Sequence, residues 1–356
     1  DQCEPVARQP ADLAAILYTS GTTGRSKGAM LSHDNLAANA KTLHAYWQWQ
    51  QGDVLLHALP LFHVHGLFVA SHGALLNGSK MIFLPKFDGA EVVRRLPQAS
   101  IFMGVPTYYV RLLTEPTFDR TTCAAMRLFV SGSAPLLLDT FTEFTQRTGH
   151  TILERYGMSE TNMLTSNPYD GNRIGGSVGL PLPGVSVRVV DDHGHACAID
   201  AIGAIQVKGP NVFKGYWRMP EKTAEEFTDD GFFITGDVGK FDSNGYLWIV
   251  GRSKDLIISG GYNVYPKEIE SVLDDMDGVA ESAVIGIPHP EFGEAVTAVV
   301  VGKPGAQLSA DTMIAALKLK IANFKVPKRI IFVDELPRNA MGKVQKKTLR
   351  EQYDTA

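Results

Sequence analysis

The run Tyr18–Gly28, with the sequence YTSGTTGRSKG, constrains this chain more than any other segment. It follows the short apolar run Ala14–Leu17, which predicts a buried strand leading into a glycine-rich turn. Glycines allow backbone N–H groups to turn toward an anion, hydroxyls add donors, and Lys27 supplies a mobile positive charge. Because Lys27 is followed by Gly28 and not by Ser or Thr, the run departs from the Walker pattern. We therefore expect a polyphosphate-binding loop of another kind rather than an ordinary surface turn.

Length, composition and charge narrow the class of protein. A chain of 356 residues suits two domains, each large enough to bury its own core. Hydrophobic residues make up 44% of the chain and charged residues 20%, as in ordinary soluble globular proteins. The net charge of −4, without a dense Lys/Arg stripe, argues against a nucleic-acid partner. No apolar run approaches the roughly 18 residues that a membrane span needs, so we expect no membrane partner.

The cysteines bear on the cellular compartment, and the first residues bear on whether the chain is a fragment. Cys3, Cys123 and Cys197 are odd in number and far apart, which fits neither a disulfide framework nor a zinc site. A reducing compartment, and hence a cytoplasmic location, is the prediction. The polar lead-in 1–12 has no initiator methionine and leaves little sequence ahead of the loop. We expect a fragment that lacks an N-terminal segment of the same protein.

The first half of the chain alternates between strand-like and helix-like segments. A helix is expected over Asp34–Trp47, with Ser32 or Asp34 as its N-cap. Strands are expected at four apolar runs: Val54–Leu61, Met81–Leu84, Ser100–Val105 and Arg127–Val130. Helices fit between these strands, as in a βαβ arrangement. The fold class is therefore α/β for this part of the chain.

From about Gly176 the pattern changes to short strands separated by Gly, Pro and Asp turns. The runs Val185–Val190, Gly203–Val207 and Tyr246–Val250 predict a small antiparallel or barrel-like unit that closes the large domain. The charged segment Gly251–Asp255 lies between two apolar strands and marks the expected boundary. We therefore assign a large domain to residues 1–252 and a small α+β domain to residues 253–356.

Helical spacing supports the small domain. Pro266 suits the first position of a helix, where its missing N–H costs nothing. Apolar residues then recur on one face at Ile269, Val272, Leu273 and Met276. Further elements are expected as strands at Ser282–Ile287, Ala295–Val301 and Ile330–Val333, and as an amphipathic helix at Thr312–Ile321.

Five motifs stand in order along nearly the whole chain. They are the loop Tyr18–Gly28, Tyr156–Glu160 (YGMSE), Tyr216–Arg218 with Thr235–Asp237 (YWR and TGD), Gly251–Asp255 (GRSKD) and Pro337–Lys343 (PRNAMGK). This set resembles the adenylate-forming superfamily of acyl-CoA synthetases, adenylation domains and luciferases. The stretches Leu153–Gly171 and Phe213–Thr223 are similar to those of bacterial malonyl-CoA synthetases. Members of this superfamily usually carry well over a hundred residues ahead of the phosphate loop, which are absent here.

The resemblance implies an acid–thiol ligase with a two-step reaction. A carboxylate attacks the α-phosphate of ATP and expels pyrophosphate, and the thiol of coenzyme A then attacks the acyl-adenylate and releases AMP. Both steps gather negative charge, so both need fixed donors and cations. The phosphate-binding residues carried over by the resemblance are Thr19, Ser20, Gly21, Thr22, Thr23, Gly24 and Lys27. ATP and Mg²⁺ are the implied cofactors, with coenzyme A as co-substrate.

Three residues carry the implied chemistry of adenylation. Glu160 would bind Mg²⁺, a hard cation that takes a carboxylate together with phosphate oxygens. Ser159 stands where the family usually has Thr and keeps a hydroxyl donor for the α-phosphate. Lys343 is the implied catalytic lysine, which would bridge the carboxylate oxygen and the α-phosphate as charge builds.

The nucleoside and coenzyme A have their own implied residues. Adenine would stack on Tyr156, beside Gly157 and against the backbone around Ser133, Ala134 and Pro135, while Asp237 and Arg252 would hold the ribose. The family swings its small domain between the two steps, and Lys254 occupies the hinge position. That motion would bring Gly260, Gly261 and Tyr262 to a pantetheine tunnel, where glycines allow a close approach.

Arg155 gives the sharpest indication of which acid is used. The matching residue in fatty-acid and aryl relatives lines the acyl pocket and is usually apolar. A buried arginine is costly unless it is paired, and a second substrate carboxylate would pair it. Malonate or methylmalonate is therefore favoured over a monoacid. Further pocket candidates are His63, His65, Met158 and, more weakly, Arg111, for which a surface position is equally expected.

Two alternatives stay open. Another small-carboxylate CoA ligase, or an adenylation domain that serves a carrier protein, would use the same motifs. A non-catalytic nucleotide-binding fragment would follow if the N-terminal part is essential.

Overall fold

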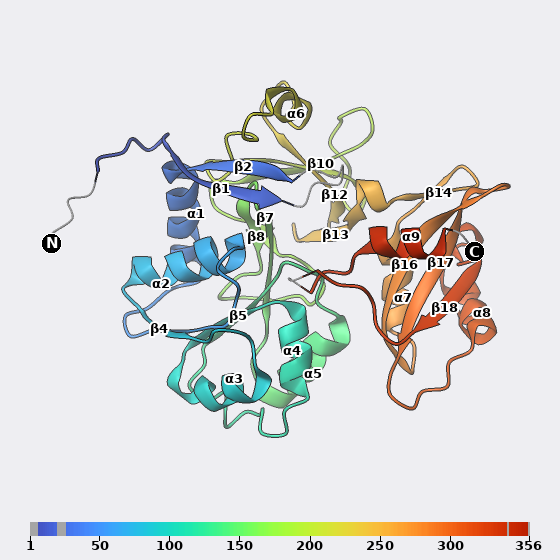
Figure 1. Cartoon of the computed structure of the whole chain (residues 1–356), viewed down its shortest axis with the longest axis horizontal. Helices are drawn as coiled ribbons and strands as arrows, with labels where there is room; N and C mark the ends of the chain where they lie inside the picture. The colour runs from blue at the N-terminus through green and yellow to red at the C-terminus, as the bar shows by residue number, and fades with distance from the viewer. Residues whose placement is uncertain (1–5, 20–25, 340–341, 355–356) are drawn as a thin grey trace. The chain divides into compact units, whose positions relative to one another are not determined.

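The computed structural model describes residues 6–19, 26–339 and 342–354 (Figure 1). Its internal contacts divide the chain into two units. The first comprises Asp1–Arg188, Ile205–Thr235 and Phe241–Trp248, and the second comprises Val189–Ala204, Gly236–Lys240 and Ile249–Ala356. The predicted domain boundary between residues 252 and 253 stays a prediction.

The strands on either side of the glycine-rich loop pair with each other. β1 (Leu13–Thr19) and β2 (Lys27–Ser32) form a two-stranded antiparallel sheet. The expected burial of Ala14–Leu17 was wrong, since Ala14 is exposed and the next three residues are half-buried. The reason is that β1 pairs with β2 alone among the described strands, so little of its surface is covered. Ser20, Gly21, Thr22, Thr23 and Gly24 lie outside the described residues.

A seven-stranded sheet forms the centre of the first unit in the described part of the chain. Its order is β4–β3–β5–β6–β7–β8–β9. Its strands are β3 (Val54–His57), β4 (Lys80–Phe83), β5 (Ile101–Gly104), β6 (Leu128–Ser131), β7 (Leu153–Met158), β8 (Asn162–Ser166) and β9 (Leu180–Pro181). Neighbours from β4 to β7 are parallel, whereas β8 and β9 add antiparallel pairs. This confirms the βαβ expectation, although β3 ends at His57, four residues before the predicted end.

Helices cover both faces of this sheet. They are α1 (His33–Tyr46), the π-helix His65–Ser71 running into α2 (His72–Asn77), α3 (Gly89–Arg95) with the 3₁₀ turn Leu96–Gln98, α4 (Pro106–Leu113) and α5 (Leu138–Thr148). The short helix α6 (Pro220–Glu225) follows further along the chain. Figure 1 shows α3, α4 and α5 gathered on one side and α1 and α2 on the other. On the α3–α5 side, Val92, Leu112 and Phe144 pack with strand residues Phe102 and Phe129 in one buried cluster.

The start of α1 confirms a sequence prediction. Ser32 is the N-cap: its Oγ accepts a hydrogen bond from the Asn35 backbone N at 3.2 Å, while the Ser32 N donates to Asn35 Oδ1 at 3.0 Å. This reciprocal capping box satisfies two backbone donors at the helix end. The helix is anchored to the sheet by Asn39, whose Nδ2 donates to the Met163 carbonyl on β8 at 2.8 Å.

One buried carboxylate ties together the starts of three parallel strands. Asp53 immediately precedes β3, and its Oδ1 accepts hydrogen bonds from Ser100 Oγ and Arg127 Nε, both at 2.7 Å. Ser100 and Arg127 immediately precede β5 and β6. Although burial opposes ionisation, the hydrogen bonds from Arg127, Gln50 and Ser100 lower the pKa of the Asp53 carboxyl.

We expect Asp53→Asn to lower the free energy of unfolding by about 3 kcal/mol, because it leaves the partly buried Arg127 charge unpaired. Chemical denaturation at pH 7 measures this loss. Since the folded pKa lies below the unfolded one, the wild-type advantage is fully present above about pH 4 and is lost as pH falls through the folded pKa. Asp230→Asn is the contrast, because Asp230 pairs with Arg188 at an exposed site and should matter little. Equal losses in the two variants would contradict the role given to Asp53.

A four-stranded sheet follows in sequence. Its order is β10–β11–β12–β13, with β10 at Ser186–Val190, β11 at Gly203–Lys208, β12 at Phe233–Phe241 and β13 at Leu247–Arg252. β10, β11 and β13 match the three short runs that the sequence predicted, whereas β12 was not predicted. The four strands lie in the part of the sequence for which the small barrel-like unit was predicted.

The second unit contains the C-terminal α+β region. Its strands are β14 (Ile257–Ser259), β15 (Tyr262–Val264), β16 (Val279–His289), β17 (Gly293–Gly302) and β18 (Arg329–Val333), in the order β15–β14–β17–β16 with β18 parallel to β17. Its helices are α7 (Pro266–Asp274), α8 (Ala310–Lys320) and α9 (Lys346–Tyr353), with 3₁₀ turns at Ser253–Asp255 and Asn323–Lys325. Pro266 opens α7 as predicted, and Ile269 and Leu273 on its inner face are buried against Val284 and Val296.

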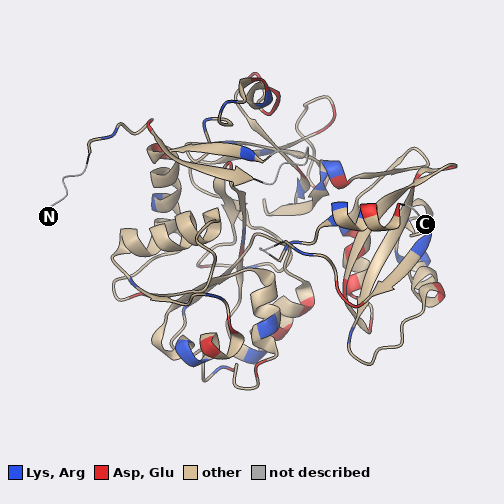
Figure 2. Ribbon diagram, viewed as in Figure 1, with Lys and Arg blue, Asp and Glu red and all other residues tan. Residues whose placement is uncertain are grey.

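Two further observations concern the apolar character of the helices and the distribution of charged residues. Among the described residues, no helix combines the length and apolar character that crossing a membrane requires. Figure 2 shows basic and acidic residues interspersed on the helices of each unit in this view, without a stripe of one sign.

Candidate active site

The hairpin formed by β7 and β8 carries the largest group of predicted site residues. Arg155, Tyr156, Gly157 and Met158 lie on β7, and Ser159 and Glu160 form the turn that leads to β8. Gly157 is required by this geometry, because a Cβ there would lie 1.9 Å from the Asn162 carbonyl oxygen on the facing strand. The motif therefore folds as a tight hairpin that presents Glu160 at its tip.

Arg155 is buried without the partners that a guanidinium normally has. Its exposed fraction is 3%, and neither Nε nor one terminal nitrogen has a hydrogen-bond partner among the described residues. The guanidinium lies against Gly132, where a Cβ would be 2.5 Å from Cζ. Burial lowers the pKa of Arg155, with Tyr109 acting in the opposite direction. Such a group indicates a place for an anion, because an unpaired buried charge is otherwise costly.

Arg155 acts electrostatically on His65, as do two further histidines, His57 and His63. His65 is 1% exposed; its Nδ1 lies 3.4 Å from Ser133 Oγ and its Nε2 has no partner in the described structure. His63 Nε2 and His57 Nδ1 are likewise buried and unpartnered there. Burial lowers the pKa of His65 well below its ordinary value, and the positive charge of Arg155 acts in the same direction. The structure thus brings His63, His65 and Arg155 into one electrostatic cluster, to which it adds His57.

The other residues predicted to line the site lie in different places. Met158 is half-buried near the end of β7. Ser133, Ala134 and Pro135 follow β6. Of these three residues, Ser133 contacts the cluster of histidines and Arg155, through His65. Arg111 is exposed on α4, and the described structure does not group it with the buried histidines. Its surface position is the one that the sequence left open.

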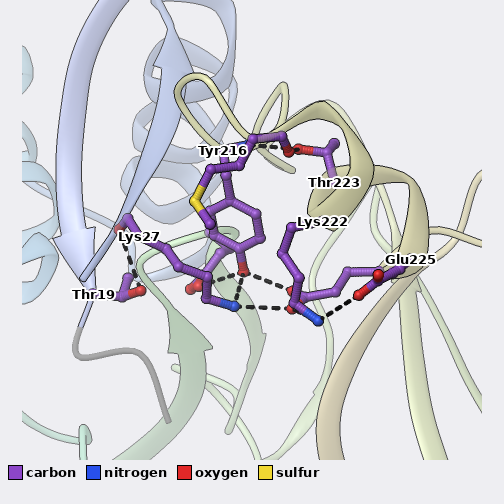
Figure 3. Close-up of polar contacts among 9 residues, drawn as sticks. Thr19, Lys27, Tyr216, Lys222, Thr223 and Glu225 are labelled. Carbon is purple, nitrogen blue, oxygen red and sulfur yellow. Dashed lines mark hydrogen bonds and ion pairs between the residues drawn. The ribbon is translucent and has the colours of Figure 1, made fainter. Parts of the chain in front are cut away.

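A second cluster joins the end of the glycine-rich loop to the hairpin tip. Figure 3 shows Lys27 and Tyr216 pointing toward each other, with Lys27 Nζ 3.1 Å from the Tyr216 hydroxyl. That hydroxyl lies 3.0 Å from Glu160 Oε1 and 2.7 Å from Glu226 Oε2. Lys27 also pairs with Glu226 at 2.9 Å, while Thr19 Oγ1 donates to the Lys27 carbonyl at 3.4 Å. Lys27 and Glu160, predicted for phosphate and metal, therefore share one neighbour.

Burial sets the protonation tendencies in this second cluster. It raises the pKa of the Glu160 carboxyl, although the Tyr216 hydrogen bond and the Lys27 charge oppose the shift. Burial, and then the negative charges of Glu160 and Glu226, raise the pKa of the Tyr216 hydroxyl well above its ordinary value. Tyr216 therefore stays a hydrogen-bond donor at neutral pH.

Sequence reasoning named Tyr216 as part of a motif and gave it no role, and it missed Glu226. Both residues are distant from Lys27 in sequence, by 189 and 199 positions. The available signal was the motif itself, because Tyr216 lies in the run Tyr216–Arg218 that carried the resemblance together with the other four motifs. Glu226 follows α6 within an acidic run and carries no such signal.

The second unit groups the other predicted residues. Asp237 on β12 is 4% exposed, and its Oδ1 lies 2.9 Å from Arg252 Nε. Arg252, Asp237, Lys254 and Asp255 are the charged groups that act on Lys343. Lys343 is exposed, and its backbone N donates to Asn339 Oδ1 at 3.0 Å in a short turn. The predicted ribose-binding pair, the hinge lysine and the catalytic lysine are thus neighbours.

A groove of about 640 Å³ lies in the second unit beside the predicted coenzyme A residues. Gly260 and Tyr262 line it, and Gly261 lies between them in the turn joining β14 to β15. The Tyr262 ring stacks on Phe324 with centroids 4.5 Å apart, and Phe292 and Lys328 line the same groove.

The donor set around Glu160 fits a magnesium ion held partly by a ligand. No group of three or more His, Cys, Asp or Glu side chains in the described part of the chain could hold a metal alone. Mg²⁺ usually takes one or two carboxylates and completes its shell with waters and phosphate oxygens. Glu160, with Glu226 on the other side of the Tyr216 hydroxyl, supplies such carboxylates beside a lysine suited to phosphate.

Comparison with known proteins assigns the family. Residues 1–217 match the AMP-binding enzyme family, and residues 268–343 match the AMP-binding enzyme C-terminal domain. This chain belongs to the AMP-binding enzyme family, the adenylate-forming superfamily that the motifs indicated.

Particular relatives narrow the comparison. A malonate–CoA ligase of Arabidopsis thaliana is 40% identical over 96% of this chain and 61% of its own length. The mitochondrial malonate–CoA ligase ACSF3 of Mus musculus is 42% identical over 95% of this chain and 64% of its own length. The crystal structure of ATP-bound MatB from Rhodopseudomonas palustris is 61% identical, with a TM-score of 0.96 over 98% of this chain and 70% of that one. The chain thus spans less than two thirds of the length of these two curated relatives.

Proposed function

We propose that this chain catalyses the ATP-dependent, AMP-forming ligation of malonate, or methylmalonate, to coenzyme A through an acyl-adenylate. The observation that carries this proposal is Arg155, a buried guanidinium with two unpartnered nitrogens, on the hairpin that also presents Glu160. A monoacid offers such a site nothing to pair with. The distal carboxylate of malonate would form charge-assisted hydrogen bonds with it. The names of the two curated relatives favour the same substrate.

The first half-reaction would use the two clusters of the first unit together. Lys27 and Thr19 would hold the β- and γ-phosphates of ATP, with Ser159 donating to the α-phosphate. Glu160 would hold Mg²⁺, which when bound neutralises charge on the phosphates as pyrophosphate leaves. Arg155, helped by His63 and His65, would hold the distal carboxylate so that the reacting carboxylate faces the α-phosphate. Positioning and charge stabilisation are the main contributions that an enzyme makes to such a transfer.

The nucleoside and the transition state have their own proposed residues. Tyr156 would stack on adenine, and Asp237 would accept hydrogen bonds from the ribose hydroxyls, with Arg252 orienting the Asp237 side chain. Lys343 would neutralise the charge that develops between the attacking carboxylate and the α-phosphate. Arg252 and Lys254 act on Lys343 as like charges and Asp237 and Asp255 as opposite ones. An anionic group beside Lys343 would favour its charged form.

The second half-reaction needs a site for coenzyme A. The groove beside Gly260 and Tyr262 has aromatic walls in Phe292 and Phe324 and a cation in Lys328. Aromatic walls suit a purine and the cation suits a phosphate. These features support coenzyme A binding there, with the turn at Gly260 and Gly261 allowing the pantetheine arm a close approach. Lys254 stays the proposed hinge.

The test is pyrophosphate release with ATP and Mg²⁺ against acetate, propionate, malonate, methylmalonate, succinate and benzoate, each with and without coenzyme A. We expect malonate or methylmalonate to exceed propionate by at least about 100-fold in kcat/KM, because a site built for a polar group rejects analogues that lack it. Succinate should be intermediate or poor, since its extra methylene displaces the distal carboxylate.

Other results would favour the alternatives. Selective turnover of a monoacid would keep the ligase class and remove malonate. Pyrophosphate release that is accelerated by a carrier protein but not by coenzyme A would indicate an adenylation domain. No release with any acid, from protein that binds ATP, would indicate a nucleotide-binding fragment that needs a further segment. The cytoplasmic location stays a prediction, since one relative is named as mitochondrial.

A further inference from the structure

The Tyr216 hydroxyl is the point at which the phosphate-binding lysine and the metal-binding carboxylate of the proposed site meet. It contacts Lys27 Nζ at 3.1 Å, Glu160 Oε1 at 3.0 Å and Glu226 Oε2 at 2.7 Å. The residue is 2% exposed, so water does not compete for these contacts. Lys27 also lies over the Tyr216 ring, 4.2 Å from its centroid. One side chain thus orients both charged groups.

The backbone around Tyr216 fixes this arrangement. Phe213 N donates to the Glu160 carbonyl at 2.7 Å, which ties the segment to the hairpin tip. Gly215 O accepts from Met30 N at 2.9 Å, and Trp217 N donates to Gly28 O at 2.8 Å, so the same segment also pairs with β2. Residues 213–217 therefore join the strand that begins at Lys27 to the turn that carries Glu160.

Lys27 has a hydrogen-bond donor and part of its positive charge available for a phosphate. An ammonium has three donors, and the described contacts of Lys27 use two, to Tyr216 and Glu226. Glu226 has a second cation in Lys222, at 3.3 Å, so Lys27 does not supply its whole counter-charge. The side chain of Lys27 is 16% exposed and is held by the ring and the hydroxyl before any ligand arrives.

We propose that Tyr216 is a positioning residue that couples Lys27 to Glu160, so that the triphosphate and its Mg²⁺ are recognised as one ligand. This inference rests on the proposed function for the identity of the ligand. Tyr216 acts through these two side chains, because its hydroxyl contacts the charged group of each. Glu226 keeps that hydroxyl and that lysine in place.

The test compares Tyr216→Phe with the wild-type chain. Phenylalanine keeps the ring that packs edge-on against Phe213, so the fold should persist. We expect the Kd for ATP in Mg²⁺, measured by titration calorimetry, to rise about tenfold, the cost of losing hydrogen bonds to charged groups. The Mg²⁺ concentration for half-maximal pyrophosphate release should also rise. ATP binding without Mg²⁺ should change less.

Two controls separate positioning from general damage. Tyr246→Phe removes a buried hydroxyl that donates to the Asn172 carbonyl at 2.8 Å, away from the cluster, and should leave both readouts within about twofold. In a Lys27→Met background, Tyr216→Phe should add less than about threefold to the Kd, because coupled residues are not additive. Unfolding midpoints for Tyr216→Phe and Tyr246→Phe should agree.

The outcomes are separable from the fate of the proposed function. An unchanged Kd and Mg²⁺ dependence in Tyr216→Phe, or an undiminished effect in the Lys27→Met background, would overturn the coupling role. If the wild-type chain binds Mg²⁺-ATP but releases no pyrophosphate with malonate, the ligase assignment fails while the Kd comparison still decides on Tyr216. A wild-type chain that binds no Mg²⁺-ATP would overturn both.

Discussion

Lys343→Ala is expected to abolish formation of the acyl-adenylate while leaving the conversion of preformed malonyl-adenylate to the thioester. The physical reason is that negative charge accumulates between the attacking carboxylate and the α-phosphate only in the first half-reaction. An ammonium held there stabilises that charge, and its loss should cost at least about 10²- to 10³-fold in kcat. Pyrophosphate release measures the first half-reaction, and AMP release from added malonyl-adenylate with coenzyme A measures the second.

The tail that carries Lys343 offers a matched control. Lys347 lies four residues further on, is exposed, and pairs only loosely with Glu351 at 3.6 Å. Lys347→Ala should therefore leave both half-reactions within about twofold of wild type. Lys343→Arg keeps the charge on a different shape and should recover part of the activity. Equal losses in both half-reactions for Lys343→Ala would remove Lys343 from its proposed role.

Arg155→Ile is expected to lower kcat/KM for malonate by roughly 10²- to 10⁴-fold, the scale of breaking a buried, hydrogen-bonded ion pair. The Kd for ATP should be nearly unchanged, because the described contacts of Arg155 lie with the histidine cluster and Gly132. Stability should be equal or higher, since the change removes a buried charge from a strand that favours β-branched residues. Kinetics with malonate and propionate, with a thermal unfolding scan, measure all three effects.

Arg111 provides the contrast that the sequence could not resolve. It was the second candidate for the distal carboxylate, and it is exposed on α4. Arg111→Ile should change malonate kinetics little, whereas Arg155→Lys, which keeps the charge but loses the fork of donors, should be intermediate. Unchanged malonate kinetics in Arg155→Ile would discard the dicarboxylate assignment while leaving the family membership intact.

Local patterns in the sequence were sufficient for most elements of the fold. Apolar runs located β4, β5 and β6 to within one or two residues, and Ser32 and Pro266 marked the starts of α1 and α7. The failures came where local pattern competes with tertiary context. β3 ends at His57, and β1 is largely uncovered although its sequence is apolar. The burial of a strand depends on which segments pack against it, and the spacing of apolar residues in the sequence does not identify those segments.

In the candidate site, too, some groupings of residues could be predicted from the sequence and others depended on tertiary contacts. Motif residues near one another in sequence, such as Arg155 and Glu160, were predicted from the resemblance, and one hairpin holds them in the structure. The meeting of Lys27 with Tyr216 and Glu226 was not, because it depends on a backbone segment that pairs with β2 and with the Glu160 turn. His57 was missed for the same reason, since an isolated histidine at a strand end has no distinguishing pattern.

The sequence by itself determined the residue types on which the proposed chemistry rests: a glycine- and hydroxyl-rich loop with its lysine, a carboxylate proposed for a metal, and an arginine proposed for a second substrate carboxylate. Residue types and their order carry that information because phosphate and carboxylate groups need particular donors. Tertiary structure alone decided which of these groups are buried, paired or left unpartnered. Desolvation depends on the surrounding packing, so only the folded chain distinguishes the buried, unsatisfied Arg155 from the exposed Arg111.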